Sequence, residues 1–475
     1  MTFYKNHKEK LGLIRSGKLK LVENVQHFLK EIEKQKELNA FNFVFVDEAI
    51  QSVKNIEGKI KNNNHGKLAG LVIAIKDVLA FKDHPLTCSS NILKNFTSLY
   101  TATAVQKLID EDAIIIGKTN CDEFAMGSSN ENSAFGNVLN PVDKNHVPGG
   151  SSGGSAVAVA ANLCDVSLGT DTGGSIRQPA AFCGVYGLKP TYGIVSRFGL
   201  TAFASSFDTI GPFSKNVEDA ALVLQVIAGK DECDSTSVDR KIPDYLSSLE
   251  NDRQLKIGIP KEYFADGLDE EIKTAILDTI DELKLEGFEI KEVSLPMTEY
   301  TIATYYILTT AEASSNLARF DGARYGIRSK IYEDLNEMYV NSRTEGFGKE
   351  VKRRIMLGTY VLSSGYYDAY YRKAQKVRRL IKQDFDKVFS EVDLIITPTT
   401  PTTAFKIGEK SSDPLQMYLS DVYTTSANLA GIPGMNIPIG RNSENLPIGL
   451  QILSQQFDEE KIFQLAAHLQ NEISG

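Results

Sequence analysis

The sequence is poor in the residues that build disulfide frameworks, zinc sites and membrane spans. Its 475 residues include five cysteines, six histidines and no tryptophan. The cysteines are odd in number and form no Cys-x-x-Cys pair, which argues against a disulfide framework and a cysteine zinc site. No stretch approaches the roughly 20 apolar residues of a membrane-spanning helix, and the first residues lack a signal-peptide pattern. We therefore expect a cytoplasmic protein, in a bacterial cytosol or an organelle, with no membrane partner and no metal.

Basic residues are also in deficit, with 52 Lys and Arg against 61 Asp and Glu and a net charge of −9 at pH 7. A protein that holds nucleic acid alone usually carries a basic stripe that neutralises phosphates. Basic runs do occur at 349–354 and 373–379. They are interleaved with apolar residues at helical spacing, which is typical of solvated helix faces. If the function involves a nucleic acid, we expect a partner to hold it.

The sequence does contain a regular alternation of apolar runs and amphipathic segments. Helices are predicted over 21–32, 47–60, 101–110, 270–286, 297–318, 346–389 and 459–470. Strands are predicted over 71–75, 113–116, 255–259, 288–295, 394–398 and 449–453. This alternation predicts an α/β fold in which helices cover a twisted mixed sheet. The polar stretch 229–254 is either a domain boundary or a surface excursion.

Two loops rich in glycine and serine are the most informative feature, Gly-Gly-Ser-Ser-Gly-Gly-Ser at 149–155 and Thr-Gly-Gly-Ser at 172–175. Glycine has no Cβ, so successive N–H groups before Ser175 can turn toward one point without steric cost. Such a cluster suits the anion that develops at an attacked carbonyl. The alternative is a glycine turn with a serine helix cap. Alone, the second loop favours that alternative; beside the first loop and a lysine, it favours a nucleophile.

The lysine is Lys76, which ends the apolar run 71–75. A lysine at such a place is usually solvated, but burial penalises its charged form and lets it act as a base. A serine hydroxyl both donates and accepts hydrogen bonds, so Ser151 would relay a proton between Ser175 and Lys76. The predicted catalytic set is therefore Lys76, Ser151 and Ser175.

Two other motifs are discarded. The segment 149–153 satisfies the Gly-x-Ser-x-Gly elbow of α/β-hydrolases, which needs a buried strand before it and a later histidine. Here the loop-like segment 140–148 precedes it, and the one later histidine, His468, lies in an amphipathic helix. Gly-Lys-Thr at 117–119 resembles the end of a phosphate-binding loop, but Asp112 stands where the leading glycine belongs.

Lys76 and the two loops resemble the amidase signature family. The resemblance continues through Gly-Leu-Lys-Pro-Thr at 187–191, Ala-Ser-Ser at 204–206 and Gly-Pro-Phe-Ser at 211–214, and it covers nearly the whole chain. It implies Ser-Ser-Lys catalysis that needs no metal or organic cofactor in this chain. It also implies a cis peptide bond before Ser151.

The same resemblance implies one compact domain, residues 1–475, around a single sheet. N-terminal helices would occupy about 1–65 and the catalytic core about 66–230. The rest of the sheet, further helices and the substrate pocket would lie in about 255–475, so the resemblance favours a surface excursion at 229–254.

The resemblance also assigns roles around the nucleophile and the substrate. The oxyanion would be stabilised by backbone amides around Thr172, Gly173, Gly174 and Ser175. Asp171 and Arg177 are expected to brace this loop.

For a free glutamine, Arg354 would pair with the α-carboxylate and Asp421 with the α-ammonium. Tyr305 would lie beside them, and Ser128 would form part of the wall. Arg353 and Tyr306 are alternatives at a shift of one residue. Structural ion pairs are the alternative role of the charged residues.

Within the family, segments 122–129, 312–322 and 358–363 are similar to the glutamine-hydrolysing subunits of tRNA-dependent amidotransferases. The resemblance implies that ammonia from glutamine converts Glu-tRNA(Gln) to Gln-tRNA(Gln), or Asp-tRNA(Asn) to Asn-tRNA(Asn). The chain would act in a heterotrimer with a B subunit, which would bind charged tRNA, ATP and magnesium, and a small C subunit. The alternatives are a stand-alone amidase for another carboxamide and a non-catalytic assembly subunit. The intact Lys76, Ser151 and Ser175 argue against the latter.

Overall fold

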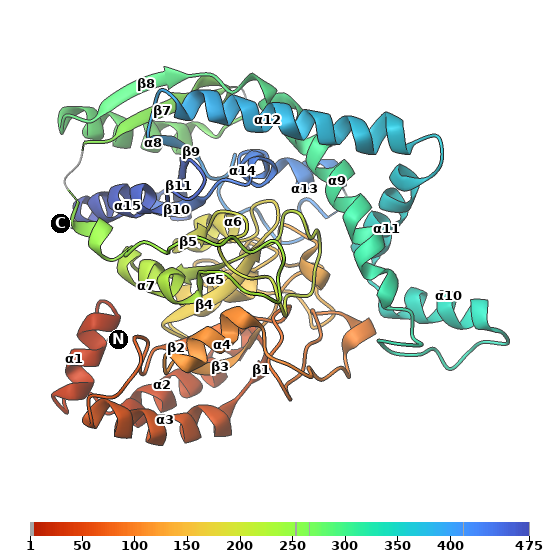
Figure 1. The fold of residues 1–475 in the computed structure, drawn as a ribbon, viewed down its shortest axis with the longest axis horizontal. Helices are drawn as coiled ribbons and strands as arrows, with labels where there is room; N and C mark the ends of the chain where they lie inside the picture. Colours follow the sequence, from red (N-terminus) through yellow and green to blue (C-terminus); the bar gives the residue numbers. More distant parts are fainter. Residues whose placement is uncertain (1–3, 252–253, 266, 412, 475) are drawn as a thin grey trace.

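The structure is a computed structural model that describes residues 4–251, 254–265, 267–411 and 413–474. Within these ranges one mixed sheet of 11 strands runs through the protein in the order β1-β3-β2-β4-β6-β5-β10-β11-β9-β7-β8 (Figure 1). In chain order the strands are β1 (Phe41–Val44), β2 (Val72–Lys76), β3 (Ile114–Thr119), β4 (Val166–Asp171), β5 (Tyr186–Lys189), β6 (Thr209–Ser214), β7 (Lys256–Pro260), β8 (Glu289–Val293), β9 (Leu394–Pro398), β10 (Gly434–Arg441) and β11 (Pro447–Ser454). The predicted α/β fold with a mixed sheet is confirmed.

Helices cover both faces and the ends of this sheet. They are α1 (His7–Arg15), α2 (Leu21–Lys34), α3 (Val46–Lys61), α4 (Thr103–Asp110), α5 (Gly153–Ala160), α6 (Arg177–Cys183), α7 (Val217–Ile227), α8 (Glu270–Leu285), α9 (Thr301–Asn316), α10 (Leu335–Gly346), α11 (Lys349–Leu362), α12 (Lys373–Phe389), α13 (Pro414–Leu419), α14 (Thr425–Ala430) and α15 (Glu459–Ser474). In Figure 1, α1 to α3 lie at one end and α8 at the other, while α9, α11 and α10 extend along one side. No helix in the described ranges has the length and apolar character of a bilayer span.

The central strands show why their sequences read as continuous apolar runs. Val72 and Ala74 of β2 pack with α2 and α3, whereas Ile73 and Ile75 belong to the core on the opposite face. Because successive side chains of a strand point to opposite faces, a strand buried on both sides is apolar throughout. β2 pairs in parallel with both β3 and β4. The carboxyl ends of β2 and β4 therefore open at the same edge of the sheet.

Two predicted helices differ from the structure. The predicted 346–389 is interrupted after α11: Gly365 takes a φ of +87°, and a π-helical turn, Tyr367–Arg372, precedes α12. Gly365 permits this left-handed turn at no steric cost. The predicted 297–318 begins with a 3₁₀ turn, Pro296–Tyr300, before α9.

The strands that were not predicted are β1, β4, β5, β6 and β10, which are short or interrupted by glycine or proline. In chain order, the described part of the stretch 229–254 follows β6 and precedes β7, and both strands belong to the same sheet. Tyr245 within this stretch is fully buried beside Phe463.

Candidate active site

Lys76 ends β2 in the interior of the protein and is fully buried. Its Nζ lies 2.7 Å from Ser151 Oγ, 2.8 Å from Ser152 Oγ and 2.9 Å from Thr170 Oγ1. Three hydroxyl oxygens thus match the three donors of an ammonium group. Burial lowers the pKa of Lys76 to about 8, so the neutral amine required of a base is accessible near neutral pH. The predicted burial of this lysine is confirmed.

Ser151 lies in the first glycine loop, just before α5. The peptide bond between Gly150 and Ser151 is cis, as the family resemblance implied. The carbonyl oxygen of Ser151 accepts a hydrogen bond from the Asp122 amide at 3.1 Å, and a Cβ on Gly150 would collide with the Asp122 carboxylate. The close approach of backbone to carboxylate explains why glycine stands there.

Ser175 follows Gly173 and Gly174 between β4 and α6. Gly174 has a φ of +136°, which side chains other than glycine rarely tolerate. Ser175 is 8% exposed, and in the part of the chain that the structure describes its hydroxyl has no hydrogen-bond partner. The Lys76–Ser151 half of the predicted relay is therefore formed, whereas transfer between Ser151 and Ser175 stays a prediction.

Asp171 and Arg177 brace the second loop as expected. Arg177 donates through Nε to Asp171 Oδ2 at 3.1 Å and through Nη2 to Oδ1 at 3.0 Å, and Asn428 Nδ2 donates to Oδ1 at 2.8 Å. Burial alone would raise the pKa of Asp171, but the Arg177 guanidinium lowers it to about 2. Two parallel charged hydrogen bonds fix orientation as well as distance, so this pair is a permanent anchor for the loop.

The Asp171 carboxylate also determines which backbone amides of the second loop are free to bind a substrate oxygen. The Gly174 amide donates to Asp171 Oδ1 at 2.9 Å. The amides of Thr172, Gly173 and Ser175 have no acceptor among the described residues. The predicted oxyanion group is thereby narrowed to these three amides, because that of Gly174 is committed to the carboxylate.

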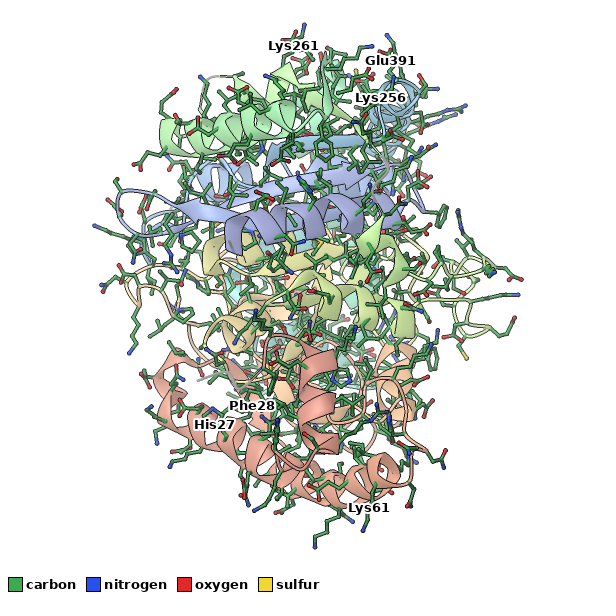
Figure 2. All side chains as sticks on the ribbon, turned by 90° about the vertical axis from the view of Figure 1, so that its left-hand side faces the viewer. His27, Phe28, Lys61, Lys256, Lys261 and Glu391 are labelled. Carbon is green, nitrogen blue, oxygen red and sulfur yellow. The ribbon has the colours of Figure 1, made fainter. Side chains whose placement is uncertain are left out.

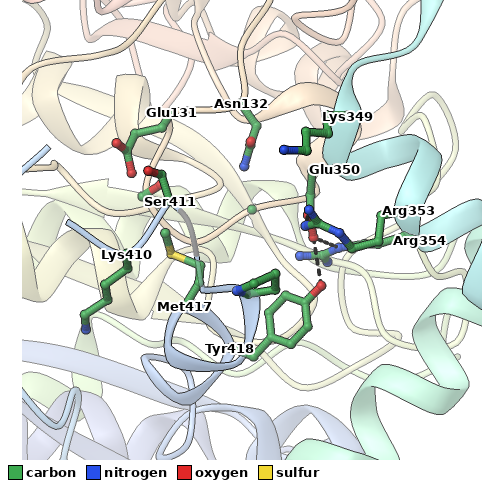
Figure 3. A pocket seen from close by; sticks show the side chains of 13 residues that line it. Glu131, Asn132, Lys349, Glu350, Arg353, Arg354, Lys410, Ser411, Met417 and Tyr418 are labelled. Atoms are coloured by element: carbon green, nitrogen blue, oxygen red, sulfur yellow. Dashed lines mark hydrogen bonds and ion pairs between the residues drawn. The ribbon is translucent and has the colours of Figure 1, made fainter. Parts of the chain in front are cut away.

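A pocket adjoins this region between α11 and the segment around α13 (Figure 3). It is lined by Gly127, Ser129, Glu131, Asn132, Lys349, Glu350, Arg353, Arg354, Lys410, Ser411, Pro414, Met417 and Tyr418. The side chain of Arg354 is 3% exposed and that of Arg353 is 34% exposed. Of these two neighbours, Arg354 is therefore the one that faces the interior, which corrects the expectation that the whole basic run is a solvated helix face.

The guanidinium of Arg354 lies among aromatic rings. Its Cζ is 5.3 Å from the ring centre of Tyr306 and 5.5 Å from those of Tyr418 and Phe203. Its Nε donates to Glu350 Oε1 at 2.8 Å, so part of its expected alternative role, a structural ion pair, is present. Its two terminal nitrogens have no hydrogen-bond partner within the described ranges. They form a fork suited to the two oxygens of a ligand carboxylate.

Asp421 and Ser128 meet in the structure. Ser128 Oγ donates to Asp421 Oδ2 at 2.5 Å. Burial raises the pKa of Asp421 to about 7, although Ser128 and Arg354 oppose the shift. No ion pair to Asp421 forms among the described residues, so a ligand ammonium would be the cation that stabilises its ionised form.

Tyr305 and Thr424 connect the recognition residues to the nucleophile loop. A Cβ on Gly173 would collide with the ring of Tyr305. Thr424 Oγ1 lies 2.7 Å from the carbonyl oxygen of Gly173 and 3.1 Å from that of Asp421. Tyr305 thus lies against the catalytic loop and Tyr306 beside Arg354, so both tyrosines belong to the site.

Comparison with known proteins identifies the family to which the chain belongs. The family model described as Amidase matches residues 23–463. The chain belongs to the amidase family. It is 55% identical over 449 residues to the A subunit of the glutamyl-tRNA(Gln) amidotransferase of Chlorobium limicola, covering 94% of this chain and 95% of that one. It is also 55% identical over 470 residues to the corresponding protein of a Sulfurihydrogenibium species, which has the same name, covering 98% and 97%.

Solved structures of this amidase family are similar as well. The A subunit of the Thermotoga maritima glutamyl-tRNA(Gln) amidotransferase superposes with a TM-score of 0.73 at 45% identity, covering 85% of this chain and 83% of that one. The native peptide amidase of Stenotrophomonas maltophilia gives a TM-score of 0.83 at 27% identity, covering 100% and 98%.

The amidase-family sequence also contains a residue that sequence analysis missed. Gln178 accepts a hydrogen bond from the Gly150 amide at 2.9 Å and donates to the Ser128 carbonyl oxygen at 2.7 Å. One buried amide therefore joins the first glycine loop to Ser128, which is predicted to form part of the substrate wall. The sequence signal that could have identified Gln178 is its place as a polar residue three positions after Ser175.

No group of three or more His, Cys, Asp or Glu side chains in the described ranges is arranged to hold a metal ion.

Proposed function

We propose that this chain is the glutamine-hydrolysing subunit of a glutamyl-tRNA(Gln) amidotransferase. The observation that carries the proposal is a pair of complementary buried charges: the open fork of Arg354, which lines the pocket, and the nearby carboxyl of Asp421, which forms no ion pair among the described residues. A free amino acid presents a carboxylate and an ammonium together. The nearly full-length relatives that bear this subunit's name support the same substrate.

The reaction begins with attack of Ser175 Oγ on the side-chain amide carbon of glutamine. Its proton passes through Ser151 to neutral Lys76, whose pKa of about 8 suits a base near neutral pH. The amides of Thr172, Gly173 and Ser175 are available to donate to the developing oxyanion.

The tetrahedral intermediate then collapses. The bond to the amide nitrogen breaks, and the proton returns through Ser151 to that nitrogen. Ammonia is released, and the glutamyl group remains bound to Ser175 as an ester. Water attacks the ester by the same route and releases glutamate. Asp171 and Arg177 keep the loop in place throughout.

We further propose that the ammonia is used by a B subunit that binds charged tRNA, ATP and magnesium, held to this chain by a small C subunit. The acceptor would be Glu-tRNA(Gln), with Asp-tRNA(Asn) as the alternative. The names of the relatives support a multi-subunit amidotransferase. Such an assembly would act in the cytoplasm.

A stand-alone amidase is the second candidate, because the chain superposes over its full length on a peptide amidase. Catalysis would be unchanged, but the charged pair would not hold the substrate.

The test measures ammonia release from glutamine by the chain alone and with its candidate partners, charged tRNA and ATP. We expect partner-dependent release that falls by about a thousandfold or more in Ser175→Ala. Ser390→Ala, at an exposed serine after α12, is the matched control and should remain active. Release from other carboxamides by the isolated chain, with glutamine ignored, would contradict the proposal and leave a free-standing amidase.

A further inference from the structure

Glu350 lies in the first turn of α11, one helical turn before Arg354, and is 8% exposed. One of its oxygens, Oε1, accepts hydrogen bonds from Arg354 Nε at 2.8 Å and from Tyr418 Oη at 3.0 Å. The other oxygen contacts Arg353 Nη1. Figure 3 shows these groups converging on the carboxylate. One side chain therefore connects three residues that line the pocket.

The contact with Arg354 determines which part of the guanidinium faces a ligand. Glu350 takes the Nε–H, and the surrounding rings restrict the plane of the group. An arginine side chain has many rotamers, and an arginine that is fixed before binding loses less conformational freedom when a ligand arrives. The fork of terminal nitrogens is thus presented to the pocket in advance.

The contact with Tyr418 extends this effect to the opposite wall. Tyr418 belongs to α13, a short helix in which no residue is buried. Its ring stacks on Tyr306, with centres 3.8 Å apart and planes at 24°, and its hydroxyl donates to Glu350. Glu350 therefore ties the exposed α13 segment to α11, which carries Arg354.

The charges of the Glu350 cluster favour the binding of an anion. Burial alone would raise the pKa of Glu350, but Arg354 and Arg353 lower it below its ordinary value. One carboxylate faces two guanidinium groups, so the cluster carries a net positive charge. Arg353 is half-exposed and can be solvated, whereas the two terminal nitrogens of the buried Arg354 have no hydrogen-bond partner within the described ranges, so a ligand carboxylate would satisfy them.

We propose that Glu350 is a positioning residue that makes the site selective for amides carrying a free α-carboxylate. It acts through Arg354 and Tyr418 and does not touch the reacting amide. The inference rests on the proposed function, because it concerns how the same pocket recognises glutamine.

Two variants separate position from charge. Glu350→Asp keeps the charge but shortens the reach by about 1.5 Å, one carbon–carbon bond. Glu350→Gln keeps the length and an acceptor oxygen but removes the charge. Each is compared on glutamine and on 4-aminobutanamide, which retains the amide and the amine but lacks the carboxylate, with the full chain in its assembled complex. Glu282→Asp, at an exposed residue of α8, is the matched control.

We expect Glu350→Asp to raise KM for glutamine about tenfold, the scale of a lost charge-assisted hydrogen bond, while kcat changes less than about threefold. The kcat/KM for 4-aminobutanamide should be unchanged, so the preference for glutamine falls about tenfold. Glu350→Gln should have the smaller effect, and Tyr418→Phe should shift KM in the same direction.

Three results would overturn the inference: equal losses on both substrates, an unchanged KM in Glu350→Asp, or a larger effect of Glu350→Gln than of Glu350→Asp. The last would assign the role to charge. A wild-type protein without a preference for glutamine would instead overturn the proposed function, and that result is visible before any Glu350 variant is measured.

Discussion

The catalytic loops and the recognition pocket lie side by side, but they are formed by different structural elements. Lys76, Ser151 and Asp171 are fully buried, and they stand at the ends of parallel strands or in a glycine loop next to them. The recognition pocket is formed by side chains of α11 and of the segment around α13, where Leu415 is 62% exposed.

This difference matches the different tasks of the two regions, which are catalysis and substrate recognition. Proton transfer and oxyanion stabilisation depend on groups held within a fraction of an ångström, so the catalytic loops are fixed by buried backbone contacts and the Asp171–Arg177 pair. The proposed recognition of glutamine would depend on two buried charges, Arg354 and Asp421, which come from distant segments of the chain. Changes on the catalytic side should therefore lower kcat, and changes on the recognition side should raise KM.

The largest effect is expected for Lys76→Met. The variant keeps much of the volume but removes the base and the donor to three hydroxyls. We expect kcat to fall by about a thousandfold, within the range for general base catalysis, with KM for glutamine little changed. Lys61→Met is the control, because Lys61 lies exposed at the end of α3, at the lower end of the molecule in Figure 2. A rise in KM with kcat preserved would contradict the assignment of Lys76 to catalysis.

Arg354→Lys tests the other half of the comparison. Lysine keeps the charge but loses the planar fork that matches a carboxylate. We expect KM for glutamine to rise by about ten- to a hundredfold with a modest change in kcat. Arg379→Lys, at an exposed arginine of α12 outside the pocket lining, is the matched control and should change KM little. Equal effects of the two substitutions would contradict the assignment of Arg354 to recognition.

The pH dependence should separate the two sides as well. In the proposed mechanism Lys76 acts in its neutral form, and its pKa is about 8, so kcat/KM should rise with pH up to about 8. In the same proposal Asp421 binds an ammonium in its ionised form, and its pKa is about 7, so KM should increase as the pH falls below about 7. Measuring both constants between pH 6 and pH 9, a range chosen to bracket these values, checks the assignment. In Asp421→Asn the low-pH rise in KM should disappear, and its persistence would assign it to another group.

The same contrast explains what the sequence predicts. Lys76 and the two glycine loops are local motifs, each specified by a few adjacent residues, and the structure brings Lys76 and Ser151 together as expected. The apolar runs of the central strands are equally local, because burial on both faces leaves no polar positions. β10, in contrast, contains Pro438 and two glycines and was not predicted.

Recognition was less visible in the sequence because it depends on contacts between distant segments. Ser128 and Asp421 are 293 residues apart and meet directly. Gln178 joins two loops through its amide, and Glu350 looks like an ordinary charged residue of a helix. Periodicity and motif spacing carry no information on such pairs, and family resemblance supplied Arg354 and Asp421 instead.

The smallest effect is expected at Gly358, one helical turn after Arg354 in α11. A Cβ there would collide with the carbonyl oxygen of Thr310 in α9, so Gly358→Ala should push the two helices apart. We expect a stability loss of about 1–3 kcal/mol, typical of overpacking, and a rise of a few-fold in KM with kcat unchanged.

Gly12→Ala is the control for this change, because Gly12 lies in α1 with nothing within 4 Å of an added Cβ. Alanine there should raise stability by about 0.5–1 kcal/mol through its greater helix propensity. Melting curves compare the two variants, and glutamine kinetics follow. If Gly358→Ala lowers stability without changing KM, the close approach of α9 and α11 supports the fold only. If KM rises, the recognition side depends on a backbone contact, as the catalytic side does at Gly150 and Gly173.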